Sequence, residues 1–149
     1  MNTIEKIRES NRIEGITRDP TASEIDSFER FMLLEKVSVM DLEDFVAVNQ
    51  PRAKLRIMSG MNVRVGGHYP PQGGQAILCK LENLLDAANA YQGSGDQAWK
   101  IHVEYETLHP FTDGNGRSGR MLWYWMMNQS TLGFLHTFYY QTLKNVQGR

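Results

Sequence analysis

Residues 109–120 read His-Pro-Phe-Thr-Asp-Gly-Asn-Gly-Arg-Ser-Gly-Arg, and the run Met-Leu-Trp-Tyr-Trp-Met-Met follows directly at 121–127. This second run is apolar and contains no glycine or proline, which predicts a buried helix over about 117–129. The polar dozen is therefore expected to form a loop that leads into the helix N-terminus. At such an end, unpaired backbone N–H groups and the helix dipole favour a bound anion.

The residue types in this loop suit phosphate chemistry. His109 carries an imidazole, the group best suited to proton abstraction near neutral pH. Asp113 offers a carboxylate oxygen of the kind that Mg²⁺ uses beside substrate phosphates. Gly114 and Gly116 let the backbone approach a phosphate closely, and Asn115 adds a side-chain donor.

Two arginines extend the pattern. Arg117 and Arg120 lie three residues apart, so they share a helix face and can each bind a pair of phosphate oxygens. Together the twelve residues predict a base, a metal ligand and a binding site for a polyphosphate. The alternative is a solvated helix start with a structural histidine, but many positions agree in order here, which favours the functional interpretation.

This stretch resembles the signature of the Fic family, His-x-Phe-x-(Asp/Glu)-Gly-Asn-Gly-(Arg/Lys)-x-x-Arg, and matches it at every specified position. The resemblance implies an all-α fold, a compact Fic-type helical bundle with a short β-hairpin flap, formed by residues 1–149 as a single domain. It also implies a protein adenylyltransferase, which transfers AMP from ATP, with Mg²⁺, to a Ser, Thr or Tyr hydroxyl of a target protein.

The resemblance also assigns roles by position. His109 would deprotonate the target hydroxyl, and Asp113 would hold Mg²⁺. The remaining motif residues would bind phosphates: the anion hole would be formed by Gly114, Asn115 and Gly116, and the guanidiniums would be those of Arg117 and Arg120, the second for the γ-phosphate.

A second motif lies near the chain start. Residues 10–15 read Ser-Asn-Arg-Ile-Glu-Gly and match the inhibitory pattern of one Fic subclass, (Ser/Thr)-x-x-x-Glu-(Gly/Asn). The resemblance implies that residues 2–15 form an inhibitory helix, in which Ser10 and Glu14 are the motif positions. Glu14 would then pair with Arg120 and occupy the guanidinium that the γ-phosphate needs. The alternative is an ordinary helix closed by its glycine.

A third segment, residues 56–74, is expected to form a flap. Val63, Arg64 and Val65 alternate in polarity and precede glycines and two prolines, which predicts a short strand or hairpin. In Fic proteins the similar segment docks the target peptide by strand addition. The alternative is a loop that merely connects helices. We expect no direct role for His68.

Composition narrows the class of protein. The chain has 149 residues, is 41% hydrophobic and carries a formal net charge of −1, which argues against a nucleic-acid partner bound through a broad basic face. One cysteine, Cys79, is expected in the core. The absence of a secretory signal or membrane-spanning run predicts a cytoplasmic protein, bacterial or, if phage-encoded, in the host cytoplasm. Oligomeric state stays open.

Further helices are expected at 21–36, at 38–50, at 74–91, at 96–108 and at 134–145. His102 lies on the apolar face of one of them and is expected to be a core residue rather than a metal ligand. Self-modification is conceivable, and candidate acceptors are Tyr124, Tyr139 and Tyr140.

Other reactions remain alternatives on the same scaffold. A kinase-like variant of the family has Lys where this chain has Gly116 and lacks the second arginine. Removal of AMP from a modified target would use Glu14 to position a water. UMP or phosphocholine transfer, or nucleotide binding without catalysis, would also leave the motif unchanged.

Overall fold

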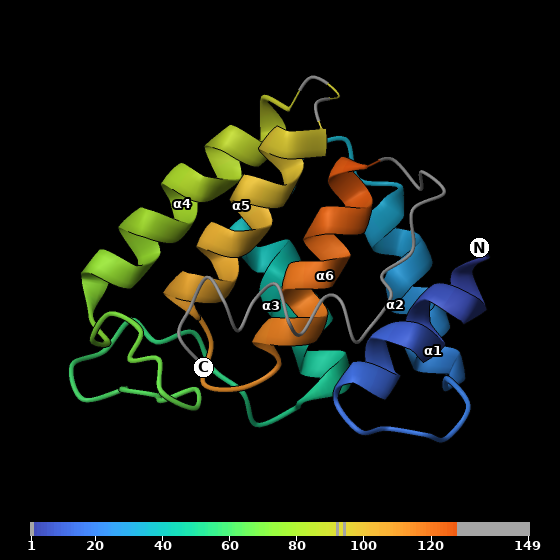
Figure 1. The fold of residues 1–149 in the computed structure, drawn as a ribbon, viewed down its shortest axis with the longest axis horizontal. Helices are drawn as coiled ribbons and strands as arrows, with labels where there is room; N and C mark the ends of the chain where they lie inside the picture. The colour runs from blue at the N-terminus through green and yellow to red at the C-terminus, as the bar shows by residue number, and fades with distance from the viewer. Residues whose placement is uncertain (1, 92, 94, 128–149) are drawn as a thin grey trace.

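In a computed structural model, residues 2–91, 93 and 95–127 are described. This part of the chain contains six α-helices and no β-strand, as expected for an all-α fold. The helices are α1 (Thr3–Ile13), α2 (Ala22–Met32), α3 (Val39–Asn49), α4 (Gln75–Asn89), α5 (Gly95–Leu108) and α6 (Asn115–Met126), shown in Figure 1. The expected helix over 134–145, with Tyr139 and Tyr140, lies outside the described residues.

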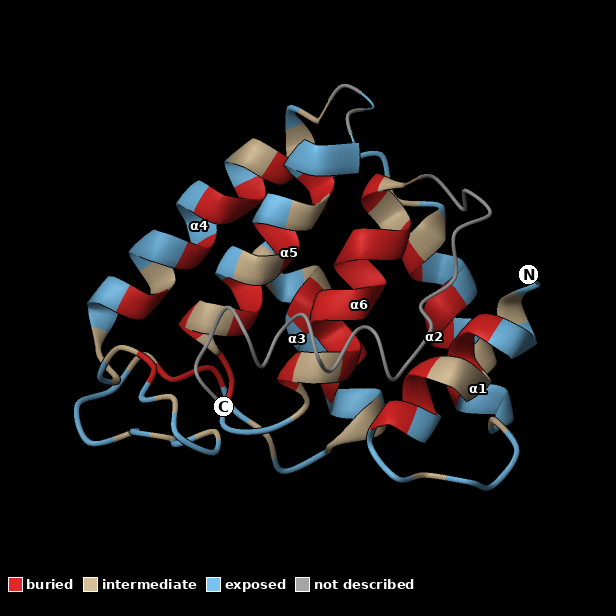
Figure 2. Ribbon diagram, in the orientation of Figure 1, coloured by how far each residue is buried: buried red, intermediate tan, exposed pale blue. Residues whose placement is uncertain are grey.

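Helix α6 forms the centre of the fold. It packs against α5 on one side and against α1, α2 and α3 on the other (Figure 1). All of its residues are buried except Gly116 and Trp125, which are half-buried (Figure 2). The buried helix predicted from the apolar run is therefore confirmed, but it begins earlier, at Asn115. The second half of the 109–120 motif is thus the first turns of α6 rather than loop.

The starts of α2 and α3 are fixed by capping boxes. Thr21 and Glu24 exchange side-chain-to-backbone hydrogen bonds at the start of α2, and Ser38 and Asp41 do so at the start of α3. Helix α2 ends at Met32, before the expected residue 36. The chain leaves the helix there because Val37 is buried and its backbone N–H and C=O are both bound by the Asn89 amide, at 2.9 Å each.

Helices α5 and α6 approach closely at Gly119. The carbonyl of Gly119 accepts a hydrogen bond from Nδ1 of His102 at 3.0 Å. His102 is fully buried, as predicted, and burial lowers the pKa of its imidazole to about 3, so the ring is neutral. A Cβ at position 119 would overlap the side chains of Tyr105 and Glu106. Glycine is therefore required for the two helices to pack at this distance.

The flap segment 56–74 contains no strand. Its β pairing is a single isolated bridge between Val65 and His68, with N–H···O distances of 3.0 and 2.9 Å. Gly66, at φ +58°, forms the turn between them. The ladder cannot continue because Pro70 and the residue after it have no backbone N–H. The β-hairpin expected from the sequence is thus reduced to a tight turn.

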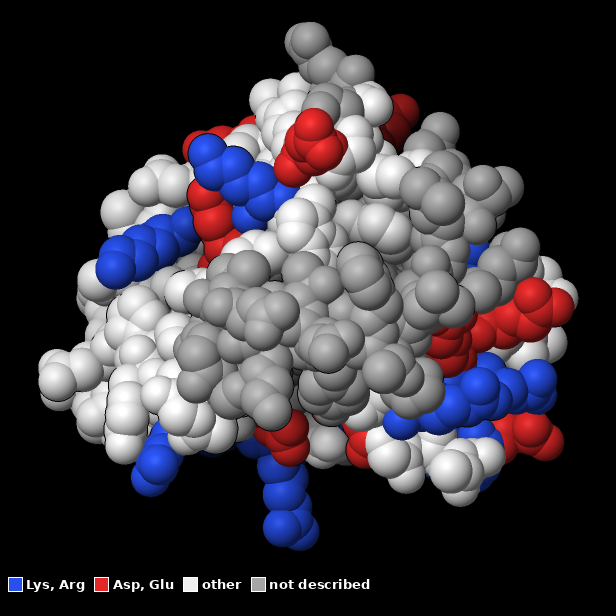
Figure 3. Space-filling model, in the orientation of Figure 1, with Lys and Arg blue, Asp and Glu red and all other residues white. Residues whose placement is uncertain are grey.

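Cys79 and most charged side chains lie on the surface of the protein. Cys79 is exposed on α4, so its predicted core position is wrong; its helical neighbours Ile77 and Leu81 occupy the buried face instead. Positive and negative side chains are interspersed on the face seen in Figure 3. Among the described helices, none combines the length and apolar character needed to cross a membrane.

Gly119→Ala is expected to destabilise the fold by about 1–3 kcal/mol, because the added methyl group overpacks the contact between α5 and α6. Urea unfolding measures the change. Gly95→Ala is the matched control, since a Cβ at the start of α5 meets nothing within 4 Å. Equal stability of the two variants would contradict the packing argument.

Candidate active site

The loop between α5 and α6 is held closed by Asn115. The Asn115 side-chain oxygen accepts from the backbone N–H of Phe111, and its amide nitrogen donates to the Phe111 carbonyl, both at 2.8 Å. Phe111 is buried and anchors the loop in the core. The sequence suggests Asn115 as an anion donor, but here its amide is used within the loop. The donors left for an anion are the first backbone N–H groups of α6.

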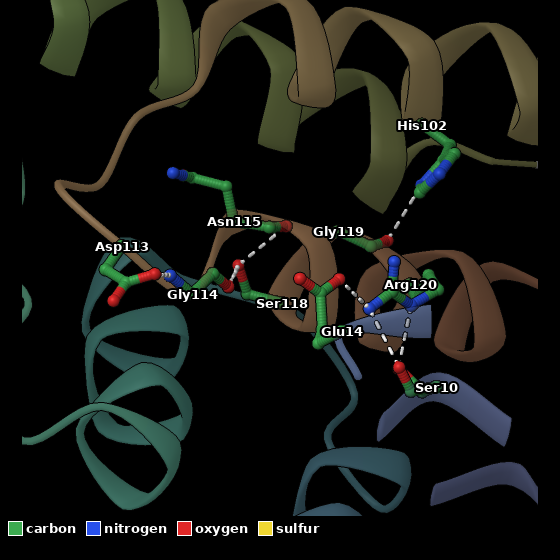
Figure 4. Close-up of polar contacts among 9 residues, drawn as sticks. All are labelled: Ser10, Glu14, His102, Asp113, Gly114, Asn115, Ser118, Gly119 and Arg120. Atoms are coloured by element: carbon green, nitrogen blue, oxygen red, sulfur yellow. Dashed lines mark hydrogen bonds and ion pairs between the residues drawn. The ribbon is translucent and has the colours of Figure 1, made fainter. Parts of the chain in front are cut away.

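The helix start itself is built on Gly114, which adopts φ +78°. Its N–H donates to Oδ1 of Asp113 at 2.8 Å, and its carbonyl accepts from Oγ of Ser118 at 2.8 Å. The Ser118 hydroxyl also contacts the buried Tyr105 hydroxyl at 2.7 Å. Figure 4 shows the contacts of Gly114 with Asp113 and Ser118 around the first turn of α6. The loop geometry is therefore connected by hydrogen bonds to the helix behind it.

Asp113 fits the metal role suggested for it. It is exposed directly before the start of α6, and carboxylate oxygen is a donor that Mg²⁺ takes together with substrate phosphates. Within the described residues, no group of three or more His, Cys, Asp or Glu could hold a metal ion. An ion here would take its other ligands from a nucleotide and water.

His109 sits immediately after α5 in an uncommon backbone conformation, φ +51°. Its ring Nδ1 lies 2.9 Å from the Glu106 carbonyl, which can only accept, so Nδ1 carries the proton. With the proton on Nδ1, Nε2 is the basic nitrogen of the neutral form of the ring. This is the tautomer that a general base at this position would require.

Arg120 is the buried charge at the centre of the site. Arg120 is 1% exposed, and its guanidinium has three contacts with the end of α1, shown in Figure 4. Nε donates to Oγ of Ser10 at 2.7 Å, and Nη2 donates to the Ser10 carbonyl at 3.1 Å and to Oε2 of Glu14 at 2.6 Å. The two motifs found in the sequence therefore meet in space.

The Glu14 carboxylate also lies directly beside Gly116 at the start of α6. A Cβ at position 116 would overlap Oε2 of Glu14 and would come within 3.1 Å of the Arg120 guanidinium. Gly116 thus leaves room for an acidic group at the start of α6. Arg117 is buried nearby; burial lowers the pKa of its guanidinium, and the charges of Glu14 and Glu24 raise it in part.

A second polar network fixes α1 on α2. The buried Glu24 carboxylate accepts from Nδ2 of Asn11 at 2.8 Å, from Nη1 of Arg18 at 2.6 Å and from the Thr21 N–H at 2.9 Å. Burial alone would raise the pKa of Glu24, but these hydrogen bonds lower it to about 2. Because Asn11 precedes Glu14 by three residues, this network helps to hold Glu14 at Arg120.

The flap residues singled out from the sequence lie apart from this cluster. Val63 and Val65 are half-buried, and Arg64 is exposed, with its guanidinium 5.1 Å from the centre of the Tyr69 ring. Nε of Arg64 donates to the Gly66 carbonyl at 2.9 Å, within the turn. The hydrogen bond of Arg64 therefore lies within the turn, while Arg64 itself is exposed to solvent.

Sequence reasoning missed two residues that organise the site, Glu24 and Arg56. Arg56 is fully buried and donates to carbonyls of the flap and of the segment that carries His109. Its backbone N–H also donates to the Pro110 carbonyl at 2.9 Å. Residues 53–58 read Ala-Lys-Leu-Arg-Ile-Met, in which two charged residues alternate with apolar ones, and the sequence alone does not say that Arg56 is buried while Lys54 is exposed.

Comparison with known proteins identifies the class. The Fic/DOC family profile matches residues 21–127, which include α2 to α6 and the complete 109–120 motif. This chain therefore belongs to the Fic/DOC family. Helix α1 precedes the matched residues.

Curated relatives share a shorter stretch. The chain is 36% identical over 63 residues to Protein adenylyltransferase Fic of Culex quinquefasciatus and to the protein of the same name in Aedes aegypti. It is 36% identical over 64 residues to that of Drosophila willistoni. Each match covers 40% of this chain and 13% of the relative. The chain thus matches only a small part of the length of these proteins.

Glu24 should make the free energy of unfolding depend on pH. Its folded-state pKa of about 2 lies below the ordinary 4.5, so its contribution is complete above 4.5 and is lost as pH falls toward 2. The free energy of unfolding is measured with urea at several pH values for wild type and Glu24→Gln. Wild type should be the more stable of the two proteins, and the difference between them should be largest above about pH 5. The difference should shrink toward about pH 3. Glu29→Gln, an exposed change on the same helix, should show a much smaller pH-dependent difference.

Proposed function

We propose that this chain is a protein adenylyltransferase that is inhibited in cis by Glu14. The observation that carries the proposal is the position of the Glu14 carboxylate, which contacts Arg120 and lies over Gly116 at the start of α6. A site built to bind phosphates is in this way filled by an acidic side chain of the same protein. The names of the relatives support transfer of AMP as the reaction.

In the proposed reaction, the target hydroxyl gives its proton to Nε2 of His109, which is basic because Nδ1–H donates to the Glu106 carbonyl. The hydroxyl oxygen then bonds to the α-phosphorus of ATP, and the bond from that phosphorus to the pyrophosphate breaks. Asp113 would hold Mg²⁺, which would neutralise charge on the leaving pyrophosphate. The α6 N-terminus and Arg117 would bind the phosphates.

Inhibition follows from charge and space. Glu14 occupies the Arg120 guanidinium that a γ-phosphate would need, and its own negative charge opposes a triphosphate beside it. ATP can bind productively only when this pair opens. Because Glu14 is 35% exposed while Arg120 is buried, the carboxylate is the partner able to leave. The proposed unit is the single domain with residues 2–15 as its inhibitory segment.

Glu14→Gly is expected to raise AMP transfer roughly tenfold to a hundredfold, because a charge-assisted hydrogen bond contributes about 1.5–3 kcal/mol. Wild type and variant are incubated with Mg²⁺ and ATP labelled on the α-phosphate, alone and with cell lysate, and label and intact mass are measured. Glu5→Gly, the same change near the other end of α1, should leave transfer at the wild-type level.

Other outcomes would reassign the reaction. Equal transfer and equal ATP affinity in wild type and Glu14→Gly would contradict inhibition by Glu14. If neither protein transfers AMP, AMP-modified protein becomes the substrate to test. Loss of AMP caused by wild type but not by Glu14→Gly would make the enzyme a hydrolase in which Glu14 positions water. ATP binding without either reaction would indicate a nucleotide-binding module.

His109→Ala in the Glu14→Gly background is expected to reduce transfer by at least about a hundredfold, since it removes the proton acceptor. ATP affinity, measured by isothermal titration calorimetry, should change little because the anion hole and both arginines remain. A large loss of ATP affinity would instead assign His109 to nucleotide binding.

A further inference from the structure

The C-terminal end of α5 is capped by side chains, most of them from the flap. A helix end leaves carbonyls without partners inside the helix, and these carry a partial negative charge. Four consecutive carbonyls, of residues 106–109, accept from side chains here. Only the first of the four donors, the His109 ring, belongs to the same segment.

Arg56 caps the last two of these carbonyls. Its Nη2 donates to the Leu108 carbonyl at 2.8 Å, and its Nε donates to the His109 carbonyl at 2.6 Å. The other side of the guanidinium faces the flap, where Nη1 donates to the carbonyls of Met61 at 3.0 Å and Pro71 at 2.8 Å. One buried cation therefore joins both ends of the flap to the backbone of the proposed base.

His68 makes a second connection. Its Nε2 lies 2.9 Å from the Thr107 carbonyl, which can only accept, so the ring donates there. His68 also forms the backbone pair with Val65 that closes the flap turn. The tip of the flap is thus attached to the helix end next to His109.

The backbone of His109 needs such support. A φ of +51° costs a side-chain-bearing residue of order 1 kcal/mol or more, and it persists only where surrounding contacts fix it. The backbone contacts that fix it include the His109 N–H to the Tyr105 carbonyl at 2.9 Å, the Arg56 Nε bond, and the Arg56 N–H to the Pro110 carbonyl. Two of these contacts come from Arg56.

We propose that Arg56 and His68 form a clamp that makes the position of the His109 ring depend on the position of the flap. They are positioning residues, because they act on His109 through the backbone of 107–109 and contact no reacting atom. If a target peptide docks on the flap, as the family resemblance predicts, it would thereby orient the base that deprotonates it. The expected effect on AMP transfer rests on the proposed function. The coupling between the flap and the His109 ring does not.

The first experiment reads the clamp without using activity. Imidazole ring signals of His109 are recorded by NMR in wild type, His68→Ala, His68→Gln and Tyr69→Ala. His68→Ala should shift the His109 signals and speed amide exchange at 107–111, and His68→Gln should restore both, because its amide can donate to the Thr107 carbonyl. Tyr69→Ala changes an exposed flap neighbour and should leave the signals in place. Unchanged His109 signals in His68→Ala would overturn the proposal.

The second experiment reads the catalytic consequence in the Glu14→Gly background. His68→Ala should lower the AMP-transfer rate at saturating ATP roughly tenfold to a hundredfold, with ATP affinity within about twofold, and His68→Gln should recover most of the rate. A full rate in His68→Ala would overturn the link to catalysis. If the parent transfers no AMP, the proposed function fails, and the NMR result still decides the clamp.

Arg56→Lys tests the contribution of Arg56 to the clamp. Lysine keeps the charge but cannot reach four carbonyls at once, so the same His109 shift is expected, with circular dichroism verifying the helical fold. If Arg56→Lys does not fold, the His68 pair of variants alone decides. A folded Arg56→Lys with unchanged His109 signals would remove Arg56 from the clamp.

Discussion

The buried guanidinium of Arg120 is the constraint around which this domain is arranged. A charge that is 1% exposed requires partners, and here the partners come from α1, more than a hundred residues away in the chain. The position of α1 is therefore part of the electrostatics of the site. In the proposed function, a phosphate and Glu14 would compete for this one cation.

Helix α1 has a second anchor besides its contact with Arg120. The Glu24 carboxylate accepts hydrogen bonds from Asn11 and Arg18, which connect α1 and the turn that follows it to α2 independently of Glu14. The proposed inhibitory contact could then be weak in itself and still be effective, because α1 would not have to reorder each time the pair reforms. Control of ATP access would depend on a small movement rather than on unfolding of the helix.

The rest of the site is rigid for a different reason. Glycines at 114, 116 and 119 allow close approaches of backbone, but hydrogen bonds and packing remove the freedom they bring. Asn115 closes the loop, and Ser118 connects it to Tyr105 in α5. On the other side, Arg56 and His68 attach the flap to the end of the same helix. A flexible sequence is thereby held in one geometry.

Much of this could be predicted from the sequence. Residue types and spacing in 109–120 singled out His109, Asp113 and both arginines as candidate site residues, and periodicity with capping residues located the described helices to within a few residues. These features are local, so the chain encodes them over one or two helical turns. The errors were also local: Cys79 faces solvent because Ile77 and Leu81 fill the buried face.

What only the tertiary structure decided is which distant groups share a partner. The placement of Glu14 over Gly116, the Glu24 network and the four carbonyls around Arg56 depend on contacts between segments far apart in the chain. A sequence pattern states that a charge is present, not that it is buried or what neutralises it. Burial and pairing are set by packing of the whole chain, and so they appear only when the helices are in place.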